Sequence, residues 1–531
     1  MIEPSPGQQP DLLARVEQIS RDFNFSPDHV RRVTGHFVRQ LKDGLANNRV
    51  WQLPAYITTL PTGMEKGEFL AVDLGGSNCR ICLVQLHGNS TFNVVQSKHV
   101  VPPNLMVNPS HRPLFEYIAQ KISDFLSSHG EKDPVRLPYK LGFTFSFTFE
   151  QTSIASGRLI HWDKGWDIPT ALGRDPCAML QEAIDEHELP VVVTVLANDS
   201  VGTLLTRSYT SGPAASTLGA VIFGTGTNAA YVEKLSNVNR IGAATKTDGI
   251  MVMNTEWGCL DDKMEVLPRT PFDDELDRAS TEPGSQMFEK RVSGLYLGEL
   301  LRLTILRLVE SGAFNMAVCE KSPVFARESI DSSFLSNLAI VGIQNIETTI
   351  NLIQDTLSVE DVSEVDALAI HGLASSIAKR AARLAGASLA ALIIQSGRLE
   401  QPHSPPHNHH VWSRHHVTAP NLQMKSIQRF WYQLGSLWRR LLNFVGMTPE
   451  VTKPGRLPHG DCETLDQNII DIGADGSLIE LHPNFETEMR GAMREVPEVG
   501  CAGEKRVRIV LSKDGSGVGA ALMAQAASQA T

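Results

Sequence analysis

The sequence predicts an α/β fold built of two halves that begin alike. Residues 69–86 (FLAVDLGGSNCRICLVQL) pass from an apolar run through an Asp and two glycines into a second apolar run. Residues 218–235 (LGAVIFGTGTNAAYVEKL) repeat this order, and Asn78 and Asn228 follow the glycines in the two stretches. Two apolar runs joined by a glycine turn are typical of a β-hairpin. Helical patterns elsewhere in the chain complete an α/β composition.

The first half is expected to begin with helices and to continue as a sheet. Residues 11–48 carry apolar side chains at helical spacing, with a Ser-Pro pair that is typical of a helix start. The elements expected next are a strand pair at 69–86, a third strand at 91–101, a helix at 113–128 and a strand at 139–151. Residues 191–200 (VVVTVLANDS) then predict a buried strand that ends in Asn198 and Asp199, followed by a helix at 201–209.

The second half is expected to be mostly helical after its hairpin. Helical patterns cover 284–312, 323–357 and 367–396, strands are expected at 469–481 and 506–512, and a glycine-started helix closes the chain at 515–528. The Pro- and His-rich stretch within 401–463 does not fit this plan. Its composition predicts a disordered surface insertion, with a metal-binding tract or an interaction helix as the alternatives.

Composition restricts the class of protein. The 531 residues carry a formal net charge of −11, which gives no overall attraction to nucleic acid or to an anionic membrane. We expect no membrane-spanning segment and no signal segment, and seven cysteines fit a reducing compartment. These features predict a soluble cytoplasmic protein. Cys79 and Cys82 form a C-x-x-C within the first hairpin, which we interpret as packing residues, with a redox role as the alternative.

The two glycine turns predict phosphate binding when they are taken together. Successive backbone N–H groups in such turns can form a nest for phosphate oxygens. Gly224, Gly226 and Ala229 match a dinucleotide fingerprint, but a strand follows where that fingerprint needs a helix, and the chain has no Gly-Lys pair for a P-loop. Asp73, before the first turn, lies where Mg²⁺ and its waters need a carboxylate. Taken singly, each glycine stretch is better explained as an ordinary turn.

Polar residues at strand ends are further candidates for the chemistry. Asn198 and Asp199 end the most apolar strand, where α/β proteins usually collect the polar groups of their sites. Lys164 lies between aromatic residues in IHWDKGWDI, and Glu256 and Glu289 follow apolar or aromatic residues. Taken singly, each of these last three charges is better explained as an ordinary solvated side chain.

The motifs of the chain resemble those of the eukaryotic hexokinase family, and most of all its fungal glucokinases. The resemblance is carried, in the family's order, by FLAVDLGGSNCR, LGFTFSF, WDKGW, ANDSVGTL, IFGTGTN, NTEWG, FEKRVSGLYLGELLR, GADGS and KDGSGVGAAL. It covers roughly residues 15–400 and 464–528. Many motifs in one order are far more specific than any one of them.

The resemblance implies an actin-like, ribonuclease H-like fold, with mixed sheets flanked by helices and a sugar cleft between two domains. It implies a small domain at 68–197 and a large domain at 1–67 and 198–514, with 401–463 as an atypical insertion. The last segment, 515–531, would be a helix that packs back on the small domain. The implied activity is ATP-dependent phosphorylation of the C6 hydroxyl of glucose, the first step of glycolysis, with Mg²⁺ bound through the ATP phosphates and water near Asp73 and Asp199.

The resemblance also implies site residues. The sugar-binding positions are Ser146, Asp163, Lys164, Asn198, Asp199, Asn228, Glu256 and Glu289. The ATP-binding positions are Asp73, Gly75, Gly76, Ser77, Asn78, Arg80, Gly224, Thr225, Gly226, Ser332, Ser336, Gly476, Ser477, Gly515 and Ser516. Of all these, Asp199 is the implied general base and Lys164 the implied cation at the transferred phosphoryl group.

The chain departs from the family's usual pattern near this chemistry. Thr148 replaces a proline, Asp163 replaces a threonine that contacts the sugar, and Trp166 replaces a phenylalanine. A carboxylate at Asp163 could pair with Lys164 and add negative charge near Asp199. These departures leave a second function open, a hexokinase-like sugar sensor or regulatory protein with weak turnover. Retention of the base and of the sugar-binding set favours the enzyme.

Overall fold

The computed structural model describes residues 12–76, 78–129, 138–162, 165–212, 216–242, 248–400, 469–512 and 514–529. These residues belong to one compact unit. The 401–463 stretch lies outside them, and so do Ser77, Asp163 and Lys164. No helix within the described ranges is long and apolar enough to cross a membrane.

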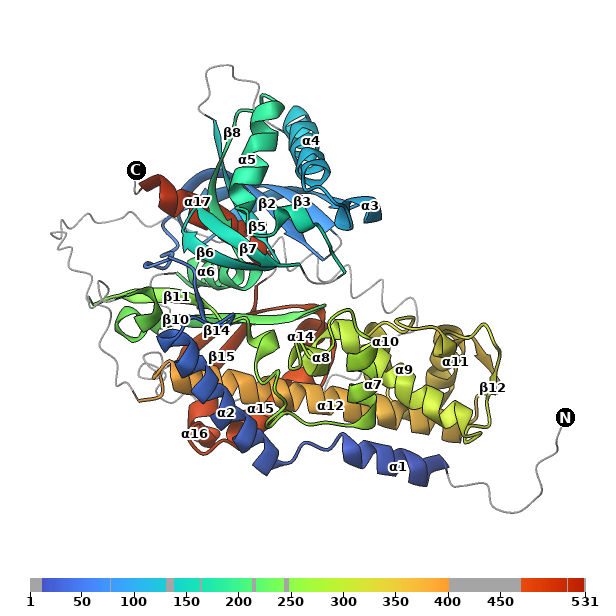
Figure 1. The fold of residues 1–531 in the computed structure, drawn as a ribbon. Coiled ribbons are helices and arrows are strands. Elements are labelled where there is room, and N and C mark those ends of the chain that lie inside the picture. Colours follow the sequence, from blue (N-terminus) through green and yellow to red (C-terminus); the bar gives the residue numbers. More distant parts are fainter. Residues whose placement is uncertain are drawn as a thin grey trace, which may run out of the picture. The chain divides into compact units, whose positions relative to one another are not determined.

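The first predicted hairpin is the centre of a five-stranded sheet with the order β4-β3-β2-β5-β8 (Figure 1). Its strands are β2 (Lys66–Gly75), β3 (Asn78–His87), β4 (Phe92–Val100), β5 (Tyr139–Phe145) and β8 (Val191–Ala197). β2, β3 and β4 are antiparallel neighbours, while β5 runs parallel to β2 and β8 parallel to β5. An antiparallel meander is therefore extended by two parallel strands.

The second predicted hairpin belongs to a six-stranded sheet with the order β1-β11-β10-β9-β14-β15. Its strands are β1 (Leu53–Pro54), β9 (Thr217–Phe223), β10 (Thr227–Lys234), β11 (Ile250–Asn254), β14 (Ile470–Asp475) and β15 (Val507–Leu511). β9, β10 and β11 form the meander, and β14 and β15 extend it in parallel. The two halves that the sequence predicts thus share one strand plan.

Two predicted strands are wrong in their extent. The stretch 139–151 is not one strand: β5 ends at Phe145, and β6 (Thr148–Ser153) pairs instead with β7 (Ser156–His161) in a separate two-stranded sheet. The break occurs where Phe147 packs 4.9 Å from the ring of Phe145. The stretch 469–481 is strand only as far as Asp475, because Gly476 has φ +108 and the short helix α14 (Ser477–Leu481) follows. A second small sheet pairs β12 (Ala317–Val318) with β13 (Val359–Glu360).

The helices begin and end at recognisable signals. The Ser26 side chain accepts a hydrogen bond from His29 N at the start of α2, and a capping box between Ser363 and Asp366 opens α12. The sequence predicts helices largely where α1, α2, α4, α6, α8 to α12 and α17 lie, but none where α3, α5, α7, α15 and α16 lie. The helices, besides α14, are α1 (Leu12–Asp22), α2 (Pro27–Ala46), α3 (Pro103–Met106), α4 (Arg112–His129), α5 (Pro176–Glu186), α6 (Asp199–Ser211), α7 (Pro271–Ala279), α8 (Glu289–Val292), α9 (Gly294–Glu310), α10 (Ser333–Val341), α11 (Ile346–Leu357), α12 (Glu364–Gln395), α15 (Phe485–Arg494), α16 (Gly500–Glu504) and α17 (Gly515–Gln529).

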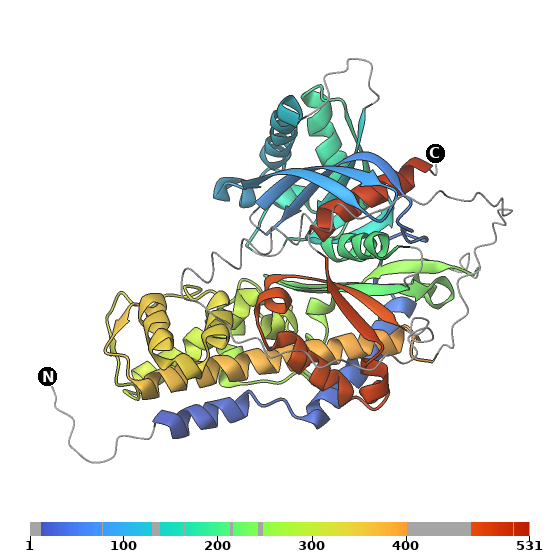
Figure 2. The same ribbon diagram turned by 180° about the vertical axis from the view of Figure 1, so that it is seen from behind.

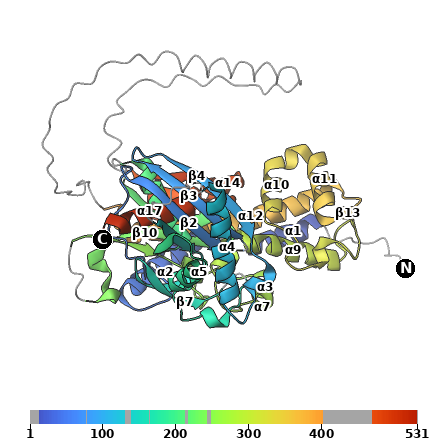
Figure 3. The ribbon, with the colours of Figure 1, turned by 90° about the horizontal axis from the view of Figure 1, so that it is seen from above.

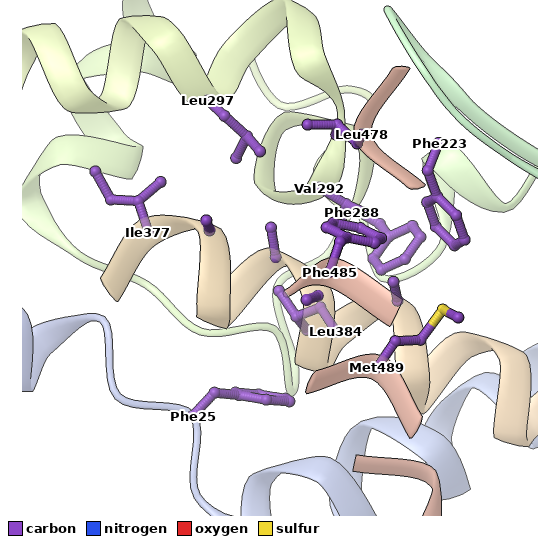
Figure 4. Packing of buried hydrophobic residues seen from close by; sticks show 14 of the residues in the cluster. Phe25, Phe223, Phe288, Val292, Leu297, Ile377, Leu384, Leu478, Phe485 and Met489 are labelled. Carbon is purple, nitrogen blue, oxygen red and sulfur yellow. The ribbon is translucent and has the colours of Figure 1, made fainter. Parts of the chain in front are cut away.

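Three buried clusters organise these elements into layers. One cluster joins α4 and α5 to the five-stranded sheet, and a second joins α6 and α17 to both sheets, so these two helices lie between the sheets (Figure 2). The third and largest cluster joins the six-stranded sheet to α2, α12 and α15. In it Phe223 of β9 packs 5.4 Å from Phe485 of α15, near Phe288 and Leu384 (Figure 4). Seen from above, α9, α10 and α11 gather around the N-terminal part of α12 (Figure 3).

Glycines allow α17 to approach its neighbours closely. A Cβ on Gly519 would lie 2.2 Å from Gly202 Cα in α6, and a Cβ on Gly142 would lie 2.3 Å from the Ala520 carbonyl oxygen. No side chain fits at such distances, so glycine is required at both places. These two close approaches place the first turn of α17, which includes Ser516, beside the β2–β3 hairpin.

The two cysteines of the first hairpin are packing residues. Cys79 is fully buried and Cys82 nearly so, and both belong to hydrophobic clusters. Burial raises the pKa of the Cys79 thiol well above its ordinary value, and burial raises the pKa of Cys82 to about 12. The reactive thiolate is thereby disfavoured, which supports packing over a redox role.

Candidate active site

Both glycine turns face one pocket of about 470 Å³. Gly75 and Gly76 reach it from the β2–β3 turn, and Thr225 and Gly226 reach it from the β9–β10 turn. The predicted site residues that line it are Asp73, Gly75, Gly76, Asn78, Arg80, Ser146, Asn198, Asp199, Thr225, Gly226, Asn228, Glu256, Glu289, Gly476 and Ser516.

The first turn requires glycine for two different reasons. A Cβ on Gly75 would lie 2.8 Å from Ser146 Cβ, closer than real side chains approach. Gly76 has φ +58, a left-handed conformation that glycine adopts without steric cost. Backbone N–H groups in such a turn suit an anion. The turn therefore presents main chain, rather than side chains, to the pocket.

Asp73 is tied to β3 and to α17 beside this turn. Its Oδ2 accepts hydrogen bonds from Arg80 Nε at 3.1 Å and from Ser516 Oγ at 2.8 Å. Arg80 Nη2 in turn donates to Ser516 Oγ at 2.9 Å, and Arg80 Nη1 lies 3.6 Å from the Asp514 carboxylate. The network places a cation and a carboxylate side by side where the sequence predicts phosphate and a hydrated metal ion.

The second turn is packed against Glu289 and Gly476. The backbone N–H of Thr227 donates to Glu289 Oε2 at 2.8 Å, and a Cβ on Gly226 would lie 2.8 Å from the same oxygen. A Cβ on Gly476 would lie 2.4 Å from the Phe223 carbonyl, at the end of β9. This turn and the GADGS stretch therefore meet with no room for side chains between them.

Asp199 is the first residue of α6, at the carboxyl end of β8. Asn198 caps the helix, since its side-chain oxygen accepts from Ser200 N at 2.9 Å and from Ser200 Oγ at 2.7 Å. Ser200 N also donates to Asp199 Oδ1 at 2.8 Å. The first turn of a helix favours a negative charge. The half-buried Asp199 side chain is thus suited to carry that charge at the pocket.

A chain of side-chain amides connects this helix start to Glu256. Asn228 Nδ2 donates to Asn198 Oδ1 at 3.3 Å and to Asn254 Oδ1 at 3.0 Å. Asn254 Nδ2 donates to Glu256 Oε1 at 2.8 Å. Each partner fixes the rotamer of the next, so three amides and the Glu256 carboxylate form one rigid wall beside the base candidate Asp199. Such a wall suits a ligand with several hydroxyl groups.

Comparison with known proteins identifies the family to which the chain with this site belongs. Two hexokinase family models match the chain, one over residues 15–209 and one over residues 218–526. This chain belongs to the hexokinase family. It is an ATP-dependent hexose kinase by family, as the resemblance implies, and the predicted family and enzyme class are confirmed.

Individual relatives match along nearly the whole chain. A glucokinase of Aspergillus niger is 38% identical, with 98% of both chains covered, and glucokinase-1 of Saccharomyces cerevisiae is 31% identical, with 97% of both covered. A solved hexokinase from Schistosoma mansoni, complexed with glucose, is 28% identical with a TM-score of 0.76 and covers 98% of this chain and 100% of its own. The predicted hexokinase fold is confirmed by this structural likeness.

Charges of both signs line the pocket of this hexokinase. Arg80 and Lys98 supply cations, while Asp73, Asp199 and Asp475 supply carboxylates. Burial, and to a smaller degree the nearby charge of Asp199, raises the pKa of Asp475 above its ordinary value. Cations beside the glycine turns suit a polyphosphate, and crowded carboxylates suit a site that also receives a divalent ion.

Several predicted positions are not part of the pocket lining. Gly224, Ser332, Ser336, Ser477 and Gly515 are described but lie behind it. Ser332 and Ser336 are buried at the start of α10, and Gly515 O accepts a hydrogen bond from Thr206 Oγ1 at 2.8 Å. Gly224 O accepts from Gly294 N at 2.7 Å, so its contact is with the α9 start. Ser77, Asp163 and Lys164 lie outside the described residues, and their predicted roles stay predictions.

The pocket also contains residues that sequence reasoning did not assign to it. They are Lys98, Phe147, Ile222, Thr227, Gln286 and Asp475. Lys98 lies opposite Arg80 in the β3–β4 register, a relation that follows from pairing the two predicted strands. Asp475 ends β14, and a polar residue at a parallel strand's end was a usable signal. Phe147, Ile222, Thr227 and Gln286 carried no comparable signal.

Proposed function

We propose that this hexokinase transfers the γ-phosphoryl group of ATP to the C6 hydroxyl of glucose, giving glucose 6-phosphate as in the first step of glycolysis. The observation that supports it is that Asp199, a wall of amide and carboxylate groups and two phosphate-type glycine turns all line one pocket. Neither half of that arrangement alone would bring an alcohol and a nucleotide together.

The wall formed by Asn198, Asn228, Glu256 and Glu289 would bind the sugar hydroxyls. Amide groups donate hydrogen bonds to hydroxyls and accept them, while carboxylates accept them. Hydrogen bonds within the wall and to Asn254 fix the first three of these side chains before the sugar arrives, and Thr227 N fixes Glu289. A fixed sugar presents its attacking oxygen in one orientation, which converts binding energy into a lower barrier. Ser146, beside Gly75, and Asp163 would complete this sugar site.

Asp199 would accept the proton of the C6 hydroxyl as that oxygen attacks phosphorus. A carboxylate at a helix N-terminus stays charged and oriented, and its neighbours hold one of its oxygens through Ser200 N. General-base assistance of this kind contributes about 100-fold to 10,000-fold. Lys164 would lie against the transferred phosphoryl group, where most phosphoryl-transfer catalysis is electrostatic.

The two glycine turns and Arg80 would bind the ATP phosphates. Mg²⁺, which ATP normally carries, would supply charge neutralisation at those phosphates. Its preference for oxygen ligands and retained waters fits the carboxylates of Asp73, Asp199 and Asp475 around the same pocket. Gly476 and Ser516, in the first turn of α17, would line the remaining part of the nucleotide site.

Two further proposals concern organisation and location. The five-stranded sheet with α4 and α5 supports a small domain at 68–197, with 1–67 and 198–514 as the large domain and the last helix packed on the small one. A pocket lined from both sheets supports a cleft that excludes water on closure. The cytoplasm is the compartment we propose, from composition.

A coupled assay of ADP formation tests this function. The protein is incubated with ATP and Mg²⁺ and with glucose, mannose or fructose, and a reaction without sugar is the control for ATP hydrolysis. We expect sugar-dependent ADP release and formation of the 6-phosphate. A protein that binds glucose in calorimetry but releases no ADP would instead be the sensor, and the kinase proposal would be abandoned.

A further inference from the structure

Trp166 makes a direct contact with the phosphate-side turn. Its indole Nε1–H donates to the carbonyl oxygen of Gly76 at 2.6 Å. Gly76 lines the pocket and has φ +58, and there is open space where a Cβ would be. Among the described residues, no neighbour packs against the Cβ position of Gly76, unlike that of Gly75, which lies against Ser146. The hydrogen bond from Trp166 therefore supplies an anchor at Gly76.

Trp166 is itself rigidly placed. Its side chain is only 4% exposed, stacks on Trp162 at 5.5 Å and 13°, and meets the edge of Phe147 at 5.0 Å. Phe147 lines the same pocket as Gly76. Stacked and edge-on aromatic pairs of this kind strengthen a buried cluster beyond simple area burial. The anchor is thus attached to the core and not to a flexible loop.

Trp162 and Trp166 bracket the short segment that carries Asp163 and Lys164. Trp162 Nε1 donates to Ile168 O at 3.0 Å and not to the phosphate turn. The stacked indole pair is therefore held to the core by the hydrogen bond of Trp162 and to the phosphate-side turn by that of Trp166. The phenylalanine that the family usually carries at Trp166 has no N–H to donate.

We infer that Trp166 is a positioning residue that fixes the Gly75–Gly76 turn for nucleotide phosphates. The inference rests on the proposed function, because that function assigns the ATP phosphates to this turn. A turn that is already ordered loses less conformational entropy when phosphate oxygens bind its N–H groups. Trp166 therefore lowers the concentration of ATP that the enzyme needs, with little direct effect on the sugar.

The test compares Trp166→Phe with Trp162→Phe. Each removes one indole N–H from the same stacked pair and leaves an aromatic ring, but only the first removes a bond to the phosphate turn. For Trp166→Phe we expect KM for ATP, and the calorimetric Kd for ADP, to rise about fivefold, the usual effect of losing one hydrogen bond. KM for glucose should change less than twofold. Trp162→Phe should change the nucleotide constants less than twofold.

Hydrogen–deuterium exchange supplies a readout that a merely structural role would not move. Peptides covering Gly75 and Gly76 should exchange faster in Trp166→Phe and not in Trp162→Phe, while β5 stays protected in both. Equal effects of the two variants, or unchanged nucleotide affinity in Trp166→Phe, would overturn the inference. Trp166→Met, whose side chain is apolar, adaptable and without an N–H donor, replaces Trp166→Phe if that variant does not fold.

The two proposals can fail separately. A wild-type protein without sugar-dependent ADP release would refute the kinase proposal, while ADP affinity and exchange at the turn would still decide the role of Trp166. Conversely, an active wild-type enzyme with unchanged nucleotide constants in Trp166→Phe would refute only the inference about Trp166.

Discussion

The backbone N–H of Thr227 donates to Glu289 Oε2 at 2.8 Å, so a phosphate-type turn also orients a carboxylate of the sugar wall. The first turn shows a parallel relation, because Gly75 packs directly on Ser146. Each glycine turn is therefore built against a residue proposed to bind sugar. Displacement of the second turn would move the Glu289 carboxylate, which accepts the hydrogen bond from that turn.

Gly226→Ala tests the contact between the second turn and Glu289. The added Cβ would lie 2.8 Å from Glu289 Oε2, too close for a real contact, so the carboxylate must move. We expect KM for glucose to rise at least about tenfold, the equivalent of about 1.4 kcal/mol. Steady-state kinetics with varied glucose and saturating ATP measure it.

Gly35→Ala is the control for that substitution. A Cβ on Gly35 in α2 would meet only the Arg39 guanidinium, at 3.8 Å. Alanine there should leave the kinetics unchanged and raise the free energy of unfolding by about 0.5–1 kcal/mol, because glycine is a poor residue within a helix. A Gly226→Ala enzyme with the wild-type KM for glucose would show that Glu289 does not bind the sugar.

Asp199→Asn tests the proposed base. Asparagine keeps an oxygen that can accept from Ser200 N but cannot take the C6 proton. We expect kcat to fall at least about 100-fold while the calorimetric Kd for glucose changes little. Asp475→Asn removes a second pocket carboxylate and should have a clearly smaller effect on kcat. Near-normal turnover in Asp199→Asn would remove Asp199 from this role.

Asp163→Thr addresses the departure closest to the proposed chemistry. If the Asp163 carboxylate competes with phosphate for the Lys164 ammonium, restoring the family's threonine should raise kcat several-fold and leave KM for ATP similar or lower. Asp163→Asn is the control, since it removes the charge but keeps the size. The measurement is the same coupled assay. A lower kcat in both variants would show that the carboxylate assists this enzyme.

The two glycine turns could be predicted because the sequence signal for each turn is local. The pattern of apolar runs around DLGGSN and GTGTN is contained in a few residues, and both turns line one pocket. The break between β5 and β6 could not be found, because hydrophobic alternation continues unchanged through Ser146 and Phe147 while the backbone leaves one sheet for another. Alternation reports burial of side chains and not membership of a sheet.

The remaining differences between the predicted and the observed pocket residues depend on contacts between residues far apart in the sequence. Lys98 reaches the pocket only because β4 pairs with β3 in a register that sets it opposite Arg80. Asp475 reaches it because β14 lies parallel to β9 and ends beside the second turn. Ser332 and Ser336 were carried over from the family pattern, and their burial in α10 depends on packing that no short motif encodes.

Asp262 is expected to make stability depend on pH. It follows Leu260 and Asp261 after the Glu256 turn, and its Oδ1 accepts from Met287 N at 2.8 Å. Burial raises its pKa from 3.8 to about 6. A carboxyl with a raised pKa binds its proton more tightly in the folded protein than in the unfolded chain. The free energy of unfolding therefore falls as pH rises from about 4 to about 6, and the penalty is complete above that.

Asp262→Asn removes this titration while keeping an oxygen for Met287 N. The variant should match the wild type near pH 4, where both side chains are neutral, and should be more stable by about 1–2 kcal/mol at pH 7.5, a value reduced for the partial exposure of the side chain. Urea unfolding at pH 4.0, 5.0, 6.0 and 7.5 measures the difference. Because the proposed mechanism does not use Asp262, kcat at pH 7.5 should change little. If the difference in the free energy of unfolding were the same at every pH, burial would not raise the pKa of the Asp262 carboxyl. The hydrogen bond from Met287 N would then compensate for the hydration that the carboxylate loses.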